Sequence, residues 1–323
     1  MKVLDQTITD RYTMYNGDSC EVLKALPSDS VHMHLYSPPF SSLYVYSSSI
    51  ADMGNSKNDC EFFNHYDYLV RETYRTLVPG RLVAVHCKQL VNYKGRDGKA
   101  GLRDFRGEII RLHQKHGFTY HAEILIWKSP VTEMQRTKSH GLLYKQLRKD
   151  SSYSRTGLPD YLLLFRKWAN DYVDKEPVTH TEETFPLSDW QNYASPLWFD
   201  DRDINVTKDF IKNFPSISVW FDINQMNVLN CRLARDDQDE KHICPLQLDV
   251  VERAVKLWTN PGDIVCSPFA GIGSEGYPTI QLGRYFVGIE LKESYYKQGC
   301  SNLKIAVSEI TKEEDRYIDE MLG

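Results

Sequence analysis

Hydrophobic positions along the chain fall into short runs with two kinds of periodicity. Short runs rich in β-branched and aromatic residues predict strands, and longer stretches with apolar residues three or four positions apart predict helices. The predicted strands are Tyr12–Asn16, Val31–Tyr36, Arg81–His86, Tyr120–Trp127, Tyr161–Phe165, Asp263–Cys266 and Arg284–Glu290. The predicted helices are Cys20–Leu26, Glu61–Leu77, Arg103–His116, Leu246–Thr259, Ser274–Leu282 and Ser294–Ala306. This alternation predicts the α/β class, with a mostly parallel sheet and helices on both faces.

Four polar residues stand at or just after the ends of predicted strands, namely Asp18, Ser37, Ser267 and Glu290. In open parallel sheets the ligand lies outside the carboxyl ends of the strands, at the point where the strand order reverses. We therefore expect these residues, although far apart in the sequence, to meet at one edge of the sheet.

The tetrapeptide Ser37-Pro38-Pro39-Phe40 directly follows the strand Val31–Tyr36. Prolines cannot donate backbone hydrogen bonds and hold φ at about −65°, so the strand must end there. The Ser37 hydroxyl and the Pro38 carbonyl can then accept from the amino group of a nucleobase, while Phe40 stacks on its ring. Taken alone, the motif favours a simple turn that ends a strand, and a second motif changes that interpretation.

The second motif is Ser267-Pro268-Phe269-Ala270-Gly271-Ile272-Gly273, between a predicted strand and a predicted helix. Glycines in such a turn let the backbone approach a ligand closely, beside the free N–H groups of a helix N-terminus. The next strand ends in Glu290, where an acid typically accepts hydrogen bonds from ribose hydroxyls. Together these features predict a site for a nucleoside cofactor.

The two motifs, in this order, resemble those of the β-type, permuted amino-group DNA methyltransferases that use S-adenosylmethionine. Further similarity lies in 16–23, 26–31, 158–167 and 242–247. The resemblance implies a permuted Rossmann-like methyltransferase sheet with an inserted target-recognition region. It also implies that a methyl group passes directly from the cofactor to an amino group of a base flipped out of double-stranded DNA.

Residue roles follow from the resemblance. Ser37, Pro38, Pro39 and Phe40 would carry the chemistry, with acceptors placed to make the amino nitrogen pyramidal as it is methylated. The expected cofactor-binding residues are Asp18, Ser267, Phe269, Ala270, Gly271, Gly273 and Glu290, with His242 and Gln247 completing the pocket. Many relatives carry Asp where this chain has Ser267. The missing carboxylate leaves open looser binding of the cofactor's ammonium group, or a substitute such as Asp263 or Glu275.

The charge distribution bears on the partner. The chain of 323 residues has a net charge of −5, which does not favour a nucleic-acid ligand. However, positions 130–157 contain six basic residues against Glu133 and Asp150, with aromatic residues between them. Such a loop is typical of phosphate contacts, although an ordinary solvated surface fits equally well. The expected DNA-binding residues are Arg136, Lys138, Lys145, Arg148, Lys149 and Arg155.

Seven dispersed cysteines without a CxxC pair indicate reduced thiols and no zinc site. With no signal peptide and no apolar run long enough for a membrane, we expect a protein of the cytoplasm of a bacterial or phage-infected cell. It would bind no metal and act as a monomer or homodimer.

The same patterns divide the chain into segments. We expect a catalytic half (1–128), a basic DNA-contacting loop (129–157), a core strand (158–168), an insertion (169–215), a cofactor-binding half (216–308) and an acidic tail (309–323) that forms a solvated helix. The aromatic and acidic insertion would complete a recognition surface, mediate dimer contacts or cover a sheet edge.

The first residue of the tetrapeptide also bears on which base is methylated. Relatives that begin the tetrapeptide with Ser more often act on cytosine N4, and those with Asp on adenine N6. Ser37 therefore favours cytosine N4, with adenine N6 as the alternative. Two other classes stay open: a methyltransferase acting on RNA or protein, whose motif usually begins with Asn, and an inactive scaffold that binds DNA without catalysis.

Overall fold

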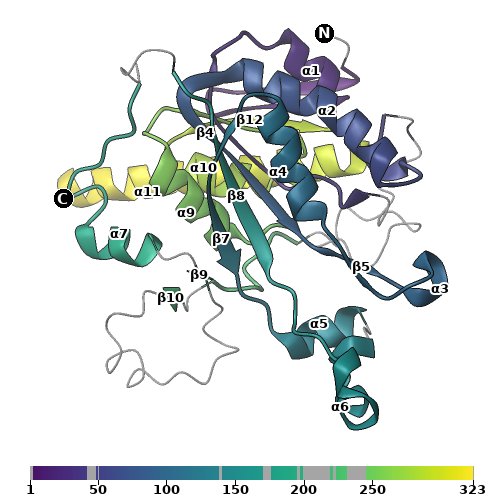
Figure 1. The fold of residues 1–323 in the computed structure, drawn as a ribbon. Helices are drawn as coiled ribbons and strands as arrows, with labels where there is room; N and C mark the ends of the chain where they lie inside the picture. Colours follow the sequence, from purple (N-terminus) through teal and green to yellow (C-terminus); the bar gives the residue numbers. More distant parts are fainter. Residues whose placement is uncertain are drawn as a thin grey trace.

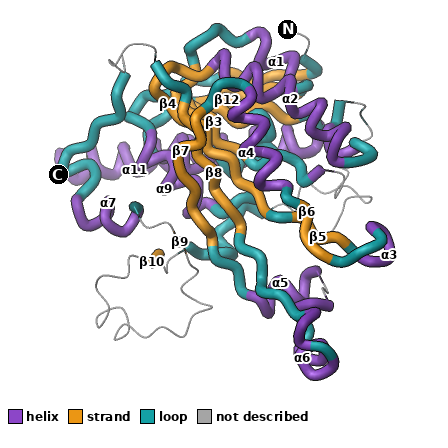
Figure 2. Tube along the Cα trace, viewed as in Figure 1, coloured by secondary structure: helices purple, strands orange, loops and turns teal. Residues whose placement is uncertain are grey.

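A twisted sheet runs through the middle of the molecule, and helices cover both of its faces (Figures 1 and 2). The computed structural model describes residues 3–41, 49, 51–137, 140–169, 176–194, 197–198, 219–220, 223–230 and 245–322. The α/β class and the mostly parallel sheet predicted from the sequence are confirmed.

Among the described residues, ten strands form this sheet in the order β1-β2-β12-β11-β3-β4-β8-β7-β9-β10. Their bounds are β1 Asp5–Ile8, β2 Tyr12–Asn16, β3 Val31–Tyr36, β4 Leu77–Lys88, β7 Thr119–Ile126, β8 Asp160–Arg166, β9 Leu197–Trp198, β10 Val219–Trp220, β11 Ile264–Ser267 and β12 Tyr285–Glu290. The C-terminal strands β11 and β12 lie between the N-terminal strands β2 and β3. Both ends of the chain therefore build one continuous sheet.

The helices divide between the two faces of the sheet (Figure 1). One face is covered by α1 Ser19–Ala25, α2 Asp59–Thr76 and α4 Phe105–Lys115. The other is covered by α9 Leu248–Trp258, α10 Gly276–Gln281 and α11 Glu293–Leu322. Strand side chains alternate accordingly: in β8, Leu163 and Phe165 pack with the first group, and Leu162 and Leu164 with the second. Burial on both faces explains why these strands are continuously apolar.

Five parallel strands, β2, β12, β11, β3 and β4, end at one edge of the sheet. Strand β8 runs antiparallel to β4 and pairs Asp160 with Lys88, so its first residue lies at that same edge. Strand β7 also ends there, because Ile126 pairs with Asp160. The ends of six strands (β2, β12, β11, β3, β4 and β7) and the start of β8 therefore lie along the same edge of the sheet.

The predicted bounds of β2 and β3 match the structure, whereas the strand predicted at 81–86 is longer, Leu77–Lys88. Strand β4 continues through Pro79 and Gly80, and Gly80 has a positive φ of 88° that glycine adopts without steric cost. The pairing register between β3 and β4 shifts beside it. The predicted tail helix is the continuation of α11.

Two segments extend from the lower end of the sheet in Figure 1; the sequence did not predict the strands of the first, and the second was expected as a basic loop (129–157) without its helices. One is a hairpin of β5 Leu90–Asn92 and β6 Gly101–Arg103, with the short helix α3 Lys94–Asp97 between them. The other, here called the basic arm (residues 130–157), contains α5 Pro130–Thr137 and α6 Tyr144–Lys149. Both follow strands that end at the edge described above.

Parts of the insertion 169–215 cover the α9 side of the sheet. The segment 176–194, which includes α7 Leu187–Tyr193, contacts the end of α9 through Asn260, whose Nδ2 donates to the Pro177 carbonyl at 2.9 Å. The guanidinium of Arg253 on α9 lies 5.1 Å from the Tyr193 ring centre. Strand β9 extends the sheet beyond β7. Three roles were expected for the insertion. The pairing of β9 with β7 concerns one of them, the covering of a sheet edge.

Candidate active site

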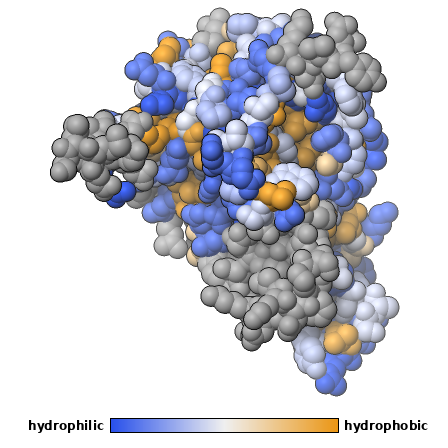
Figure 3. Space-filling model, turned by 90° about the vertical axis from the view of Figure 1, so that its left-hand side faces the viewer, coloured by the Kyte–Doolittle hydropathy of each residue, from blue (hydrophilic) through white to orange (hydrophobic). Residues whose placement is uncertain are grey.

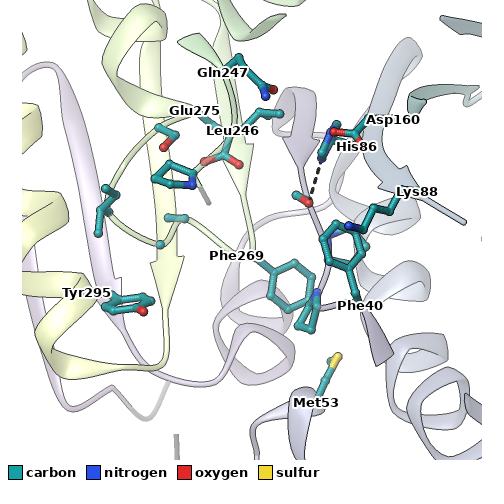
Figure 4. Close-up of a pocket in the computed structure, with 18 of the residues that line it drawn as sticks. Phe40, Met53, His86, Lys88, Asp160, Leu246, Gln247, Phe269, Glu275 and Tyr295 are labelled. Atoms are coloured by element: carbon teal, nitrogen blue, oxygen red, sulfur yellow. Dashed lines mark hydrogen bonds and ion pairs between the residues drawn. The ribbon is translucent and has the colours of Figure 1, made fainter. Parts of the chain in front are cut away.

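A cavity of about 690 Å³ opens at the carboxyl edge of the parallel strands (Figure 4). Its walls come from both ends of the chain. The N-terminal half contributes Asp18, Ser37 to Phe40 and His86, and the C-terminal half contributes Gln247, Phe269 to Ile272, Glu275 and Glu290. The convergence expected from the strand ends is thus observed for Asp18, Ser37 and Glu290.

The tetrapeptide Ser37–Phe40 leaves β3 in a tight turn. The Ser41 amide donates to the Pro39 carbonyl at 2.9 Å, and Ser41 has a positive φ of 52°. Its buried hydroxyl donates to Asp59, which also pairs with Arg103 of the hairpin at 2.8 Å. These contacts hold the turn and commit the Pro39 carbonyl to it. The Ser37 hydroxyl and the Pro38 carbonyl are therefore the candidate acceptors for a substrate.

The Ser37 hydroxyl takes part in a chain of hydrogen bonds that the sequence did not indicate. His86, near the end of β4, has Nδ1 3.1 Å from Ser37 Oγ and Nε2 3.1 Å from an Asp160 carboxylate oxygen (Figure 4). An ionised carboxylate only accepts hydrogen bonds, so the Nε2–H of a neutral His86 donates to Asp160. Nδ1 then accepts from the Ser37 hydroxyl, which leaves the serine oxygen able to accept from a third group.

Asp160 is held as a carboxylate. Burial alone would raise its pKa, but the Lys128 ammonium, 2.6 Å away, and the hydrogen bond from His86 hold that pKa well below its usual range. His86 and Asp160 were visible as polar residues at the ends of apolar runs, the same signal that pointed to Ser37. What the sequence did not show was the antiparallel direction of β8, which brings Asp160 to this edge.

Phe40 forms one wall of the cavity. Its ring meets Phe105 edge-on, with ring centres 6.3 Å apart, and the Lys88 ammonium lies 5.6 Å from its centre. Figure 4 places Phe40 beside Phe269, across the boundary between the two halves of the site. A planar base entering here meets aromatic surface on one side and the hydrogen-bonded Ser37 on another.

Glu290, at the end of β12, is tied to the glycine turn. Its two carboxylate oxygens accept from the amides of Gly271 and Lys292, each at 2.8 Å. Burial raises the pKa of Glu290 to about 7, although the two amides oppose that rise. Each oxygen keeps a second lone pair, so the carboxylate can still accept from the hydroxyls of a ribose.

The glycine turn separates into residues that face the cavity and residues that pack beneath it. Gly271 lines the cavity with a positive φ of 52°, and a side chain added there would meet open space. Gly273, at φ 88°, instead packs against Leu303 of α11. Ser267 is fully buried and is not among the residues that line the cavity.

The remaining expected cofactor residues are placed as follows. Asp18 lines the cavity and caps α1, accepting from the Cys20 amide at 2.8 Å. Gln247 lines it from the start of α9, and its buried Oε1 has no hydrogen-bond partner in the described part of the chain. His242 lies outside the described residues. Asp263 stands at the opposite end of β11, paired with the buried Arg81, so it cannot replace the missing carboxylate.

The basic arm carries three exposed cations, Lys145, Arg148 and Lys149, on α6. The tip of the arm is mainly hydrophilic at the bottom of Figure 3. Arg155 is different: it pairs with Glu133 at 3.3 Å, and Glu133 also accepts from the Leu158 amide, so both hold the arm to β8. Arg136 lies on α5, and Lys138 lies outside the described residues.

Fold and site define a class of protein: a Rossmann-like transferase with a nucleoside-cofactor pocket beside a polar, aromatic substrate site. The model of the DNA methylase family N6_N4_Mtase matches residues 31–300, and the chain belongs to this family. The resemblance seen in the sequence motifs is confirmed. The family's enzymes are S-adenosylmethionine-dependent amino-group DNA methyltransferases, acting on cytosine N4 or adenine N6.

Known proteins are similar over most of the chain. The DNA adenine methyltransferase YhdJ of Escherichia coli K12 is 23% identical over 91% of this chain and 83% of its own length. The type II methyltransferase M.BglII of Bacillus subtilis is 24% identical over 87% of this chain and 66% of its own length.

Solved structures share the fold. The Thermus thermophilus protein TTHA0409, complexed with S-adenosyl-L-methionine, has a TM-score of 0.62 at 22% identity and covers 93% of this chain and 95% of its own. The cytosine-N4-specific PvuII DNA methyltransferase has a TM-score of 0.58 at 16% identity, covering 93% and 90%. Within the described residues, no helix is both long and apolar enough to cross a bilayer.

Proposed function

We propose that this chain transfers a methyl group from S-adenosylmethionine to the exocyclic N4 amino group of cytosine in double-stranded DNA. The observation that carries the proposal is the hydrogen-bonded chain Ser37–His86–Asp160, which faces the same cavity as the glycine turn and Glu290. An acceptor for an amino group and a pocket for a nucleoside cofactor thus stand side by side.

The residues present fit the cofactor. The open space beside Gly271 lets a ligand reach the backbone, and Glu290 and Asp18 offer carboxylate oxygens to hydroxyl and amino donors. Bound there, S-adenosylmethionine would supply a methyl group activated by its sulfonium. Phe269 lines the cavity and lies next to Phe40 in Figure 4, where the cofactor would meet the substrate base.

Ser37 and the Pro38 carbonyl would direct the amino nitrogen. That nitrogen is a poor nucleophile because its lone pair is delocalised into the ring. Two acceptors set off the ring plane favour a pyramidal nitrogen and stabilise the positive charge that develops on it. The transfer is direct, with no covalent bond between enzyme and base.

His86 would then receive the proton that the methylated nitrogen releases. The Ser37 oxygen takes the proton from nitrogen while its own hydroxyl proton passes to His86 Nδ1, 3.1 Å away. The imidazolium that forms is stabilised by Asp160 through Nε2–H. This chain of hydrogen bonds lets a neutral serine hydroxyl direct the amino group at neutral pH.

The choice of cytosine rests on Ser37 at the head of the tetrapeptide. The relatives point both ways, since PvuII methyltransferase is cytosine-N4-specific and YhdJ is an adenine methyltransferase. The basic arm would contact the phosphates of the duplex from which the base is flipped out. With DNA as substrate, the reaction belongs in the cytoplasm of a bacterial or phage-infected cell.

The test is to incubate the protein with unmethylated duplex DNA and S-adenosylmethionine, digest the DNA to nucleosides and identify methylated species by mass spectrometry. N4-methylcytosine is the expected product. N6-methyladenine would overturn the choice of base and keep the reaction. Parallel reactions contain RNA or protein in place of DNA. Absence of any methylated nucleoside from the DNA, together with methylation of RNA or protein, would overturn the choice of acceptor.

A further inference from the structure

Glu275 is a buried acid in the cavity wall that no step of the proposed transfer uses. It precedes α10, and its side chain makes no capping hydrogen bond to that helix. Only 4% of the residue is exposed, yet it lines the cavity, and Figure 4 places it near Leu246 and Gln247. Among the residues that the structure describes, no cation forms an ion pair with its carboxylate.

An unpaired carboxylate at this depth is costly, because burial disfavours the charged form. Burial raises the pKa of Glu275 to about 8, and the nearby Glu290 carboxylate adds to the rise, although its own backbone amide opposes it. Apart from this backbone amide, no group in the described part of the chain offsets the cost of the charge. A buried acid in a cleft, without a structural partner, is typical of a residue kept for a ligand.

The position of the acid indicates which part of a ligand it meets. Glu290 and Asp18 lie at the ends of β12 and β2, where the ribose and base of a nucleoside cofactor would lie. Glu275 instead stands after the glycine turn, beside Gln247 at the start of α9. Gln247 Oε1 is itself a buried acceptor without a partner in the described residues. Two acceptors facing one end of the cavity fit a cationic group with several N–H donors.

The chain also lacks the carboxylate that many relatives carry at the end of the cofactor strand, which could bind such a cationic group. Ser267, where many relatives carry Asp, is neutral and does not line the cavity, and Asp263 is occupied by Arg81 at the far end of the strand. Glu275 stands eight positions after Ser267, at the start of α10, and does line the cavity.

We propose that Glu275, with Gln247 as a second acceptor, binds the α-ammonium group of the cofactor's amino-acid tail. The inference rests on the proposed use of S-adenosylmethionine. It assigns recognition of the tail to a position that neither motif of the sequence contains, and it gives the buried acid an ionic partner only when the cofactor is bound.

The experiment compares two ligands that differ in the tail, measured by calorimetry without DNA. S-adenosylhomocysteine carries the ammonium group and no sulfonium, and methylthioadenosine keeps the nucleoside and the sulfur but lacks the amino acid. The variant Glu275→Gln should bind S-adenosylhomocysteine about 10- to 100-fold more weakly than the wild type and methylthioadenosine within about 2-fold. Retained binding of methylthioadenosine also shows that the variant is folded.

Two further variants complete the design. Glu290→Gln should weaken both ligands, because both carry the ribose, and Glu293→Gln, an exposed acid on α11, should weaken neither. Equal losses of both ligands in Glu275→Gln, or no loss of S-adenosylhomocysteine, would overturn the assignment of Glu275. Failure of the wild type to bind any of these nucleosides would instead overturn the proposed cofactor.

Discussion

The imidazole Nδ1 of His86 lies 3.1 Å from the hydroxyl of Ser37, and the two residues come from the ends of neighbouring parallel strands. This pair joins the substrate motif to Asp160, so that the serine is part of a hydrogen-bonded unit. Ser37 donates to His86 and keeps its lone pairs for an incoming amino group. The relationship leads to the first prediction.

Replacing His86 by Ala should lower the rate of methyl transfer by about 10²- to 10⁴-fold, because the proton acceptor behind Ser37 is lost. Cofactor affinity should stay within about 2-fold. Single-turnover methylation and calorimetry measure the two quantities. His65→Ala, an exposed histidine on α2, is the matched control. A parallel loss of cofactor binding would show that His86 shapes the pocket and does not act on the transfer.

Replacing Phe40 by Ala should weaken methylation of duplex DNA by about 10- to 100-fold, because stacking on a base contributes about 1–3 kcal/mol. Phe40→Tyr keeps the ring and should keep most of the activity. Steady-state kinetics with duplex DNA separate these outcomes. The prediction fails if Phe40→Ala methylates as fast as Phe40→Tyr while both bind the cofactor normally.

Removing the three cations of α6 (Lys145, Arg148 and Lys149, each to Ala) should weaken DNA binding and flatten its dependence on salt. The slope of log K against log salt falls by about 0.9 for each phosphate that the protein no longer neutralises. Lys297→Ala, an exposed lysine on α11, should change neither quantity. An unchanged slope in the triple variant, measured by fluorescence anisotropy, would assign the phosphate contacts to another surface.

Glu275 and Glu290 predict an unusual pH dependence of stability. Their folded-state pKa values, about 8 and about 7, lie above the ordinary value of 4.5. The folded protein therefore binds more protons than the unfolded chain between about pH 5 and pH 8, and these groups make stability fall as pH rises. The free energy of unfolding of Glu275→Gln is to be compared with that of the wild type at each pH. The difference should shift in favour of the variant by ~1–3 kcal/mol, a relative gain, between about pH 5.5 and about pH 8.5. Urea unfolding at both pH values measures this gain, and an equal difference at both would contradict it.

A pair of glycines tests the turn itself. Both Gly271 and Gly262 have positive φ, 52° and 83°, with open space where a side chain would stand. Substitution by Ala should cost each about 1–2 kcal/mol of stability through backbone strain. Only Gly271 lines the cavity, so only Gly271→Ala should also weaken cofactor binding. Equal cofactor affinities of the two variants, measured by calorimetry, would show that the turn does not approach the ligand.

The strands and the two motifs were readable from the sequence because their causes are local. The pattern of apolar residues predicted the first and last residues of β2 and β3 correctly, and the prolines at positions 38 and 39 explain why β3 ends where it does. Glycines at 271 and 273 marked the turn, although only the structure separated the one that faces the cavity from the one that packs on Leu303. The family resemblance rested on these local features, and the family match confirmed it.

The partners of the site were decided by tertiary structure. Asp160 reaches His86, 74 residues away, because β8 runs antiparallel to β4 and starts where the other strands end. Asp263 and Glu275 were equal candidates in the sequence, but they lie beyond opposite ends of β11, one paired with Arg81 and the other lining the cavity. Strand formation depends on neighbours along the chain, whereas burial and pairing of a charge depend on which distant segments pack around it. The sequence therefore determined the elements and the motifs, and the packing of the sheet decided which side chains act together.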